Sequence, residues 1–257
     1  MNNSYLAFSS FAPMLADPTL SKKSLNTQTK GQADSLSRSP RADLLRFLVI
    51  DDHEAILIGT VPALQQAYPQ ATIATAKDLK SAQIEIDQYP PDLIVVDLSL
   101  PEAPRRQATA DVGMRLLDSL ISSDLAPNIM VLSTNVRPLV RLKPVINSYG
   151  GGFVALDKSS PIGEMLRSVE MALRGSTFLP PELRKRPEFD RKWLRVLKLK
   201  YQEGLSDRAI AREMGISDRT VRNYWVRIQD ALEVRESADK DLRIQIEMAA
   251  RRAGLIS

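Results

Sequence analysis

Carboxylates follow two short aliphatic runs in this chain. Asp51 and Asp52 come directly after LRFLVI (residues 45–50), and Asp97 comes directly after LIVV (residues 93–96). Charged groups at the ends of buried runs repel one another and cost free energy unless a cation sits among them. Oxygen ligands favour a hard ion such as Mg²⁺, which takes one or two carboxylates together with phosphate oxygens. The three carboxylates therefore predict a Mg²⁺ site able to carry a phosphoryl group.

A hydroxyl and an ammonium group follow two later apolar runs. Ser133 and Thr134 come after IMVL (residues 129–132), and Lys158 comes shortly after FVAL (residues 153–156). Hydroxyl and lysine side chains both bind phosphate oxygens. If these residues meet the carboxylates, the site can hold a phosphoryl group from several sides.

Each of these residues also has an ordinary structural interpretation. Taken alone, Asp97 suits a helix cap, Ser133 a turn and Lys158 a solvated surface position. His53, the only histidine, suits a surface position or a helix start, and a zinc site is not expected without a second His or Cys. The joint site is favoured because all of the candidates fall at the ends of strands of one predicted sheet.

Short runs rich in Val and Ile alternate with amphipathic segments, which predicts strands alternating with helices. The expected strands are residues 45–50, 71–75, 93–96, 129–132 and 153–156, and the expected helices are residues 54–67, 78–88, 111–122, 138–148 and 161–174. This order predicts an α/β fold: a doubly wound, five-stranded parallel sheet of the flavodoxin type, covered on both faces. Ligands of such sheets bind at the carboxyl ends of the strands.

Four motifs over residues 45–176 resemble the receiver domain of bacterial response regulators. In chain order they are the pair Asp51-Asp52, Asp97 with Pro101 four residues on, Ser133 after a hydrophobic run, and Lys158 followed by Ser-Ser-Pro. Their order and their places after strands make the set more specific than any single motif.

The resemblance implies a role for each of these residues. Asp97 would accept a phosphoryl group from a sensor histidine kinase or a phosphotransfer protein. The metal ligands would be Asp52 directly, Asp51 through water, Asp97 itself and the Ser99 carbonyl, with Ser133 as the switch hydroxyl and Lys158 as the phosphate partner.

The chain departs from the receiver pattern at three places. Ala155 stands where an aromatic switch residue is usual, although Phe153 is expected to face the same side two residues earlier. A run of three glycines, residues 150–152, precedes the last strand. The loop after Pro101 is long and carries a basic pair at residues 105 and 106. These departures leave open how phosphorylation is coupled to the output.

Residues 177–190 contain three prolines and a basic cluster, which predicts a linker. A small all-helical domain is expected over residues 191–257. Within it, Ser206 and Ser217 are expected to cap two helices that a turn at Gly215 separates, as in a helix-turn-helix. The second helix would bury Val221, Trp225, Ile228 and Leu232. Its opposite face would present Arg219, Arg222, Asn223, Val226 and Arg227 to base edges in the major groove.

The segments "AIAREMGIS", "RTVRNYW" and "RRAGLI" resemble the LuxR-type output domain of NarL/FixJ-class response regulators, over residues 188–257. The resemblance implies binding to double-stranded promoter DNA, and a homodimer formed through a last helix at about residues 239–253. Two alternatives stay open: a helical hairpin whose arginines are only solvated, and a last helix that packs on its own domain. Lys192-Trp193 also replaces the usual Arg-Glu pair.

The composition is that of an ordinary globular protein, with 44% hydrophobic and 26% charged residues. The net charge is +5 over residues 181–257, −3 over residues 45–180 and +2 over residues 1–44, so the basic excess lies mostly in the predicted DNA-binding part. No run approaches the ~18 apolar residues of a membrane helix. A signal peptide is not expected, and residues 1–44 are expected to form a flexible tail. The lack of cysteine fits a cytoplasmic protein.

Together these observations predict a DNA-binding transcriptional response regulator of a two-component phosphorelay. One alternative is a regulator with a degenerate receiver that binds DNA without phosphorylation, which Ala155 motivates. An aspartate-nucleophile phosphatase is disfavoured, because Ser99 occupies the position of a second Asp and the chain has no Gly-rich nucleotide loop. An enzyme is therefore not expected. The kinase, the signal and the target promoters do not follow from the residues.

Overall fold

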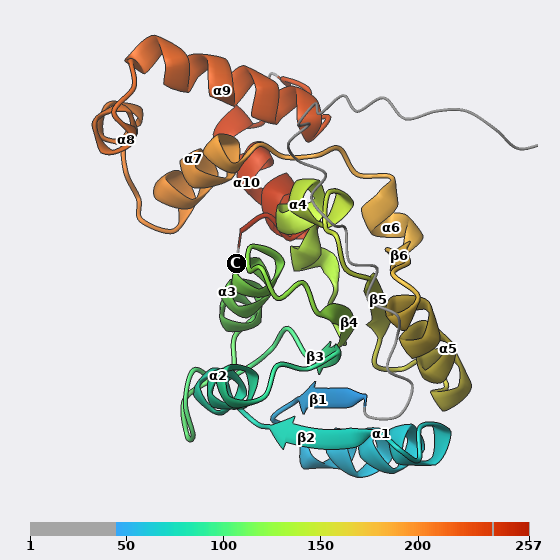
Figure 1. Cartoon of the computed structure of the whole chain (residues 1–257). Helices are drawn as coiled ribbons and strands as arrows, with labels where there is room; N and C mark the ends of the chain where they lie inside the picture. The colour runs from blue at the N-terminus through green and yellow to red at the C-terminus, as the bar shows by residue number, and fades with distance from the viewer. Residues whose placement is uncertain (1–44, 238, 257) are drawn as a thin grey trace, which may run out of the picture. The chain divides into compact units, whose positions relative to one another are not determined.

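The computed structural model describes residues 45–237 and 239–256, so the tail expected over residues 1–44 lies outside the described residues. A parallel sheet with the strand order β2-β1-β3-β4-β5-β6 forms the first part of the described chain (Figure 1). Its strands are β1 (Arg46–Ile50), β2 (Thr72–Ala76), β3 (Leu93–Val96), β4 (Asn128–Ser133), β5 (Phe153–Asp157) and β6 (Thr177–Phe178). The expected doubly wound parallel sheet is confirmed.

Helices cover both faces of the sheet. One apolar cluster joins Phe47 and Val49 of β1 to α1 (Glu54–Ala67) and α5 (Ile162–Leu173). The other joins Leu48 of β1 to α2 (Leu79–Gln88) and α3 (Ala110–Ile121). Since side chains alternate along a strand, a strand covered on both faces must be apolar throughout, which explains the unbroken aliphatic runs.

The sheet has six strands instead of the five that we expected. The sixth strand, β6, lies within the predicted linker and pairs with β5, with Thr177 opposite Phe153. The short helix α6 (Pro181–Arg184) follows. A strand of two residues is too short to show a hydrophobic period, so it can be recognised only from its pairing with β5.

The segment after β6 makes specific contacts with the region between β4 and β5. Lys143 is buried, and its Nζ donates hydrogen bonds to the carbonyl oxygens of Arg184 and Arg186 at 2.8 and 2.5 Å. Asn147 Nδ2 donates to Glu188 Oε1 at 2.7 Å. These bonds hold residues 184–188 against the α/β part rather than leaving them as a free tether.

The expected fourth helix is broken in two. A 3₁₀ helix, η1 (Arg137–Leu142), leads into the short helix α4 (Lys143–Asn147). Pro138 and Pro144 each lie in the first turn of one of these pieces. Pro144 lacks the N–H group for a helical hydrogen bond and its ring crowds the preceding turn, which favours a break between η1 and α4.

The described C-terminal part is helical: α7 (Arg191–Tyr201), α8 (Asp207–Met214), α9 (Asp218–Ala231) and α10 (Leu242–Ala253). The two predicted caps are confirmed, since Ser206 accepts a hydrogen bond from the Ala209 N–H and Ser217 from the Thr220 N–H. Gly215 ends α8 with φ 64°, a left-handed conformation that favours glycine. These signals produce the helix-turn-helix of α8 and α9.

One polar network ties the helices of this part together. Asp207 accepts hydrogen bonds from Trp225 Nε1 at 3.2 Å and from Arg243 Nη2 at 2.9 Å. The Arg243 guanidinium lies 3.8 Å from the centre of the Trp225 ring, and Tyr201 donates to the Arg243 carbonyl oxygen. Burial raises the pKa of Tyr201 to about 12, so its hydroxyl stays protonated and continues to donate. The network holds α9 in a fixed orientation relative to α7, α8 and α10.

No helix in the described part of the chain is both long and apolar enough to span a membrane.

Candidate functional site

The acidic cluster lies at the carboxyl edge of the sheet, where three strand ends meet. Asp51 follows β1, Asp97 follows β3 and Lys158 follows β5. The β1–β3 register pairs Ile50 with Val96, so the two aspartates leave adjacent strands at the same level. Both aspartates are buried, and Lys158 Nζ lies 2.7 Å from Asp51 Oδ2 and 2.6 Å from Asp97 Oδ2.

The direction of the Lys158 pKa shift reflects its interactions with the two carboxylates. Burial alone would lower the pKa of its ammonium group, but hydrogen bonds to Asp51 and Asp97, and the charges of both, outweigh burial and raise the pKa. Lys158 is therefore charged at neutral pH and bridges the two carboxylates.

The same edge gathers three carboxylates and one imidazole. Ligand atoms of Asp51, Asp52, His53 and Asp97 all lie within 4.8 Å of one another. Asp52 Oδ1 is buried and makes no hydrogen bond to the described residues, although His53 Nδ1 lies 2.9 Å from it. Carboxylate oxygens are the ligands that a hard cation prefers, and the three carboxylates gathered here therefore suit Mg²⁺.

His53 lies in this cluster, which the sequence reasoning did not foresee. Its side chain is 61% exposed, as expected for a surface residue, yet Nδ1 approaches Asp51 Oδ1 at 3.2 Å as well as Asp52. Its position next to the acidic pair was the signal that could have placed it here.

The other predicted phosphate-site residues lie beside the cluster. The Ser99 N–H donates to Asp97 Oδ1 at 3.2 Å. Ser133 ends β4 and is buried, and its carbonyl oxygen accepts the Lys158 N–H at 3.3 Å. Thr134 is exposed. The structure thus brings the phosphate-site residues predicted from the sequence to one edge of the sheet.

Residue 155 carries no aromatic ring, and Phe153 does not replace one. Both side chains are fully buried and belong to the same core cluster, so they face the same side, as expected. However, β5 pairs Phe153 with Ile129 and Asp157 with Ser133. Four residues of strand separate these levels by about 13 Å, so the ring lies too far along the strand to meet the Ser133 hydroxyl.

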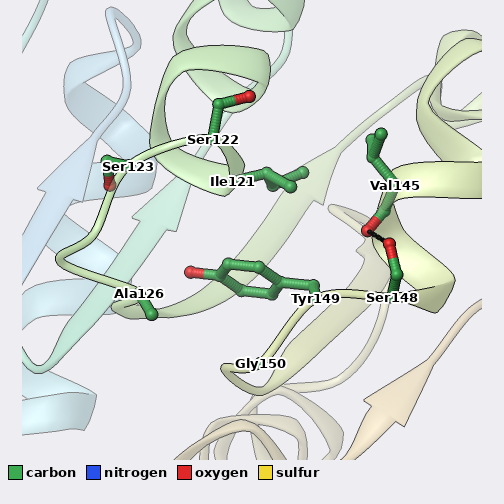
Figure 2. Close-up of a pocket in the computed structure, with 8 residues that line it drawn as sticks. All are labelled: Ile121, Ser122, Ser123, Ala126, Val145, Ser148, Tyr149 and Gly150. Carbon is green, nitrogen blue, oxygen red and sulfur yellow. Dashed lines mark hydrogen bonds between the residues drawn. The ribbon is translucent and has the colours of Figure 1, made fainter.

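A pocket of about 250 Å³ lies at the opposite edge of the sheet, near the starts of β4 and β5. Figure 2 shows the Tyr149 ring extending across it toward Ala126, with Ser122, Ser123 and Ser148 around it. Burial raises the pKa of Tyr149 well above its ordinary value, and its hydroxyl donates to the Pro127 carbonyl oxygen at 2.5 Å. The ring is thus part of the wall, and the pocket is separate from the acidic cluster.

Helix α9 presents the polar face that the sequence predicts. Its buried stripe includes Val221, Trp225 and Ile228. Its exposed residues include Arg219, Arg222, Asn223, Val226 and Arg227, together with Asp218 and Asp230 near its two ends. Val226 is 57% exposed, which is unusual for an aliphatic residue on a helix with a packed opposite face.

Comparisons with known proteins extend over both parts of the chain. Residues 187–230 match the family model of the Homeodomain-like domain. The chain is 26% identical over 202 residues to the transcriptional regulatory protein YdfI of Bacillus subtilis, covering 73% of this chain and 89% of that protein. It is 24% identical over 197 residues to the DNA-binding transcriptional activator DevR/DosR of Mycobacterium tuberculosis, covering 72% and 87%.

A solved structure shows the same fold over most of the chain. The two-component response regulator RcsB, solved in a complex with DNA, matches with a TM-score of 0.50 at 19% identity, covering 80% of this chain and 98% of that one. This chain therefore has the fold of the two-component response regulator RcsB. In this architecture the acidic cluster belongs to the receiver-like sheet, and the matched Homeodomain-like segment contains α7, α8 and most of α9.

Proposed function

We propose that this response regulator controls transcription by binding promoter DNA, and that phosphorylation of Asp97 by a sensor histidine kinase or a phosphotransfer protein regulates the binding. The observation that carries the proposal is the position of Lys158 Nζ, 2.6 Å from Asp97 Oδ2 and 2.7 Å from Asp51 Oδ2. A lysine shared by two buried carboxylates can turn to a phosphoryl oxygen once one carboxylate is esterified.

The residues of the cluster have distinct roles in this proposal. An Asp97 oxygen forms the new bond to phosphorus as the bond from phosphorus to the donor nitrogen breaks. Lys158 donates to a phosphoryl oxygen, and Ser133 donates its hydroxyl to another. Asp51, Asp52, Asp97 and the Ser99 carbonyl would hold Mg²⁺, which when bound neutralises charge on the transferred group. The acceleration then comes from positioning and electrostatics.

The domain assignment belongs to the same proposal. Residues 45–176 would form the receiver domain, 177–190 the connection and 191–257 the DNA-binding domain. Helix α10 buries Ile246, Ala250 and Ala253 but leaves Ile244 and Met248 more than half exposed. The exposed pair supports a homodimer contact through α10, while other parts of α10 lie against α7 and against η1. We place the protein in the cytoplasm and assign it no enzymatic turnover of its own.

Phosphorylation is tested by treating the protein with acetyl phosphate and Mg²⁺ and running a phosphate-affinity gel. We expect the wild type to shift and Asp97→Asn to show no shift, because an amide cannot form the acyl phosphate. Asp87→Asn, which removes an exposed carboxylate of α2, should shift like the wild type. A wild type that fails to shift would contradict the phosphoacceptor role and favour the alternative of phosphorylation-independent DNA binding.

The DNA-binding face is tested with Arg222→Ala. We expect specific binding to weaken by about 1–3 kcal/mol, because Arg222 lies exposed on α9, where it can reach base edges. The measurement is a titration against a duplex that the wild-type protein has selected from genomic fragments. Arg167→Ala removes an exposed cation of α5 and should leave the affinity unchanged. Equal affinities for Arg222→Ala and the wild type would show that α9 is not the recognition helix.

A further inference from the structure

The loop between β3 and α3 is closed into a hairpin. Leu100 and Thr109 form an antiparallel bridge in which the Leu100 N–H donates to Thr109 O at 3.3 Å and the Thr109 N–H donates to Leu100 O at 3.0 Å. Leu100 is fully buried, so the base of the hairpin is anchored in the core. Asp97 precedes this base by only three residues. The hairpin therefore projects from the edge of the sheet that carries the acidic cluster.

The hairpin also rests on the start of α2 (Figure 1). The Leu79 N–H donates to the Pro101 carbonyl oxygen at 3.0 Å, and the Lys80 N–H approaches the Glu102 carbonyl oxygen at 3.3 Å. These bonds use N–H groups that the first turn of a helix leaves without partners in the helix. Two attachments, one to the sheet and one to α2, place Lys80 beside the hairpin.

Three exposed cations gather on this structure: Arg105 and Arg106 of the hairpin, and Lys80 of α2. None of the three side chains makes an ion pair with the described residues. Their neighbours do, since Lys77 pairs with Glu54 at 3.4 Å and Arg115 pairs with Glu102 at 3.1 Å. Residues 45–180 carry a net charge of −3, so this group, which we call the basic hairpin, is a local exception.

Arg105 has a backbone conformation that arginine rarely adopts. Its φ is 66°, in the left-handed region that glycine and asparagine adopt at lower cost. A strained residue at an exposed position is the kind of outlier that points to a function of its side chain.

We propose that the basic hairpin attracts anionic phosphodonors to Asp97 and so sets the rate of its phosphorylation. The inference rests on the proposed function and adds a determinant of the rate at which Asp97 is phosphorylated. The cluster itself holds three carboxylates against one ammonium group, so it repels an incoming phosphate before Mg²⁺ and Lys158 can engage it. Cations at the rim of a site offset such repulsion and raise the rate of encounter, and salt screens their effect.

The test follows the transfer from acetyl phosphate, in which the bond from phosphorus to the acetyl oxygen breaks, an Asp97 oxygen bonds to phosphorus, and acetate leaves. The variant is Arg105→Ala/Arg106→Ala. The matched control, Arg167→Ala/Arg174→Ala, removes two exposed cations from α5 and its C-terminal end. The measurement is the initial rate of Asp97 phosphorylation on a phosphate-affinity gel, with Mg²⁺ held constant, at low and at high salt.

At low salt we expect the hairpin variant to react about tenfold more slowly than the wild type, and the control to match the wild type. At high salt the rates should converge, because screening removes the attraction. Phosphoramidate, which carries a smaller net negative charge, should show a smaller difference between the variant and the wild type. Lys80→Ala leaves the hairpin sequence intact and should slow the reaction in the same salt-dependent way, which excludes misfolding of the loop as the cause.

The outcomes separate the two proposals. If the wild type is phosphorylated on Asp97 and the hairpin variant reacts equally fast at low salt, the role of the basic hairpin is wrong and the proposed function stands. If the wild type is not phosphorylated at all, both are wrong. A slowing that persists unchanged at high salt also contradicts the inference, because it indicates a contact or a folding defect rather than attraction at a distance.

Discussion

Lys158→Met is expected to lower the free energy of unfolding by about 3–5 kcal/mol, measured by urea unfolding in the presence of EDTA. Methionine keeps the length of the side chain but removes the charge that lies within 2.7 Å of both Asp51 and Asp97. The two carboxylates are almost fully buried, so they cannot regain their lost partner from water. Removing one member of a buried ion pair leaves an uncompensated charge, and here it leaves two.

The control for this prediction is Lys185→Met, which removes an exposed lysine at the end of α6 and should leave stability nearly unchanged. Adding Mg²⁺ should restore more stability to Lys158→Met than it gives the wild type, because the cation then replaces the missing ammonium charge. An unchanged urea midpoint for Lys158→Met in EDTA would show that Lys158 does not hold the carboxylates together.

Gly152→Ala is expected to destabilise the protein by about 3 kcal/mol or more, because the added methyl group would overlap with backbone. A Cβ at this position would lie 1.9 Å from the Ala172 carbonyl oxygen near the end of α5. The glycine is also fixed on its other side, where its N–H donates to Asn128 Oδ1 and its carbonyl oxygen accepts from Ile129. The start of β5 therefore cannot move away from α5 without breaking these bonds to β4.

The glycine run provides its own matched control. Gly150, two residues earlier, has no atom within 4 Å of an added Cβ. Gly150→Ala should therefore be neutral, or stabilising by up to about 1 kcal/mol, because alanine restricts the unfolded chain. Urea midpoints of the two variants measured side by side are the test, and equal midpoints would mean that the close approach of β5 to α5 is not required for stability.

Much of the site could be predicted because it depends on local rules. Aliphatic runs that alternate with amphipathic segments define a parallel sheet, and a parallel sheet must bring Asp51, Asp97 and Lys158 to one edge. The caps at Ser206 and Ser217 were equally readable, because a hydroxyl before a helical pattern satisfies the first free N–H groups.

The features that were missed depend on partners distant in sequence. Thr177 and Phe178 form a strand because they pair with the edge of β5. A segment of two residues is too short to show the alternating pattern by which a strand is predicted. Lys143 appears in the sequence as an ordinary surface lysine. Its ammonium group nevertheless donates hydrogen bonds to two carbonyl oxygens more than forty residues away along the chain. The prolines at 138 and 144 are a signal that the segment is not one regular α-helix. The prediction of a single helix over residues 138–148 gave more weight to the amphipathic pattern and was wrong.

The alanine at position 155 has a consequence for how a signal would leave the proposed phosphorylation site. A switch needs an element with two discrete arrangements whose balance a ligand can change. A methyl group has no alternative rotamer, so residue 155 cannot store a second state. The segment after Ser133 contains η1, a 3₁₀ helix, whose hydrogen bonds have poorer geometry than those of an α-helix, which suits it to such a change. In this chain the signal would travel as a change of helical winding rather than as the turn of a ring.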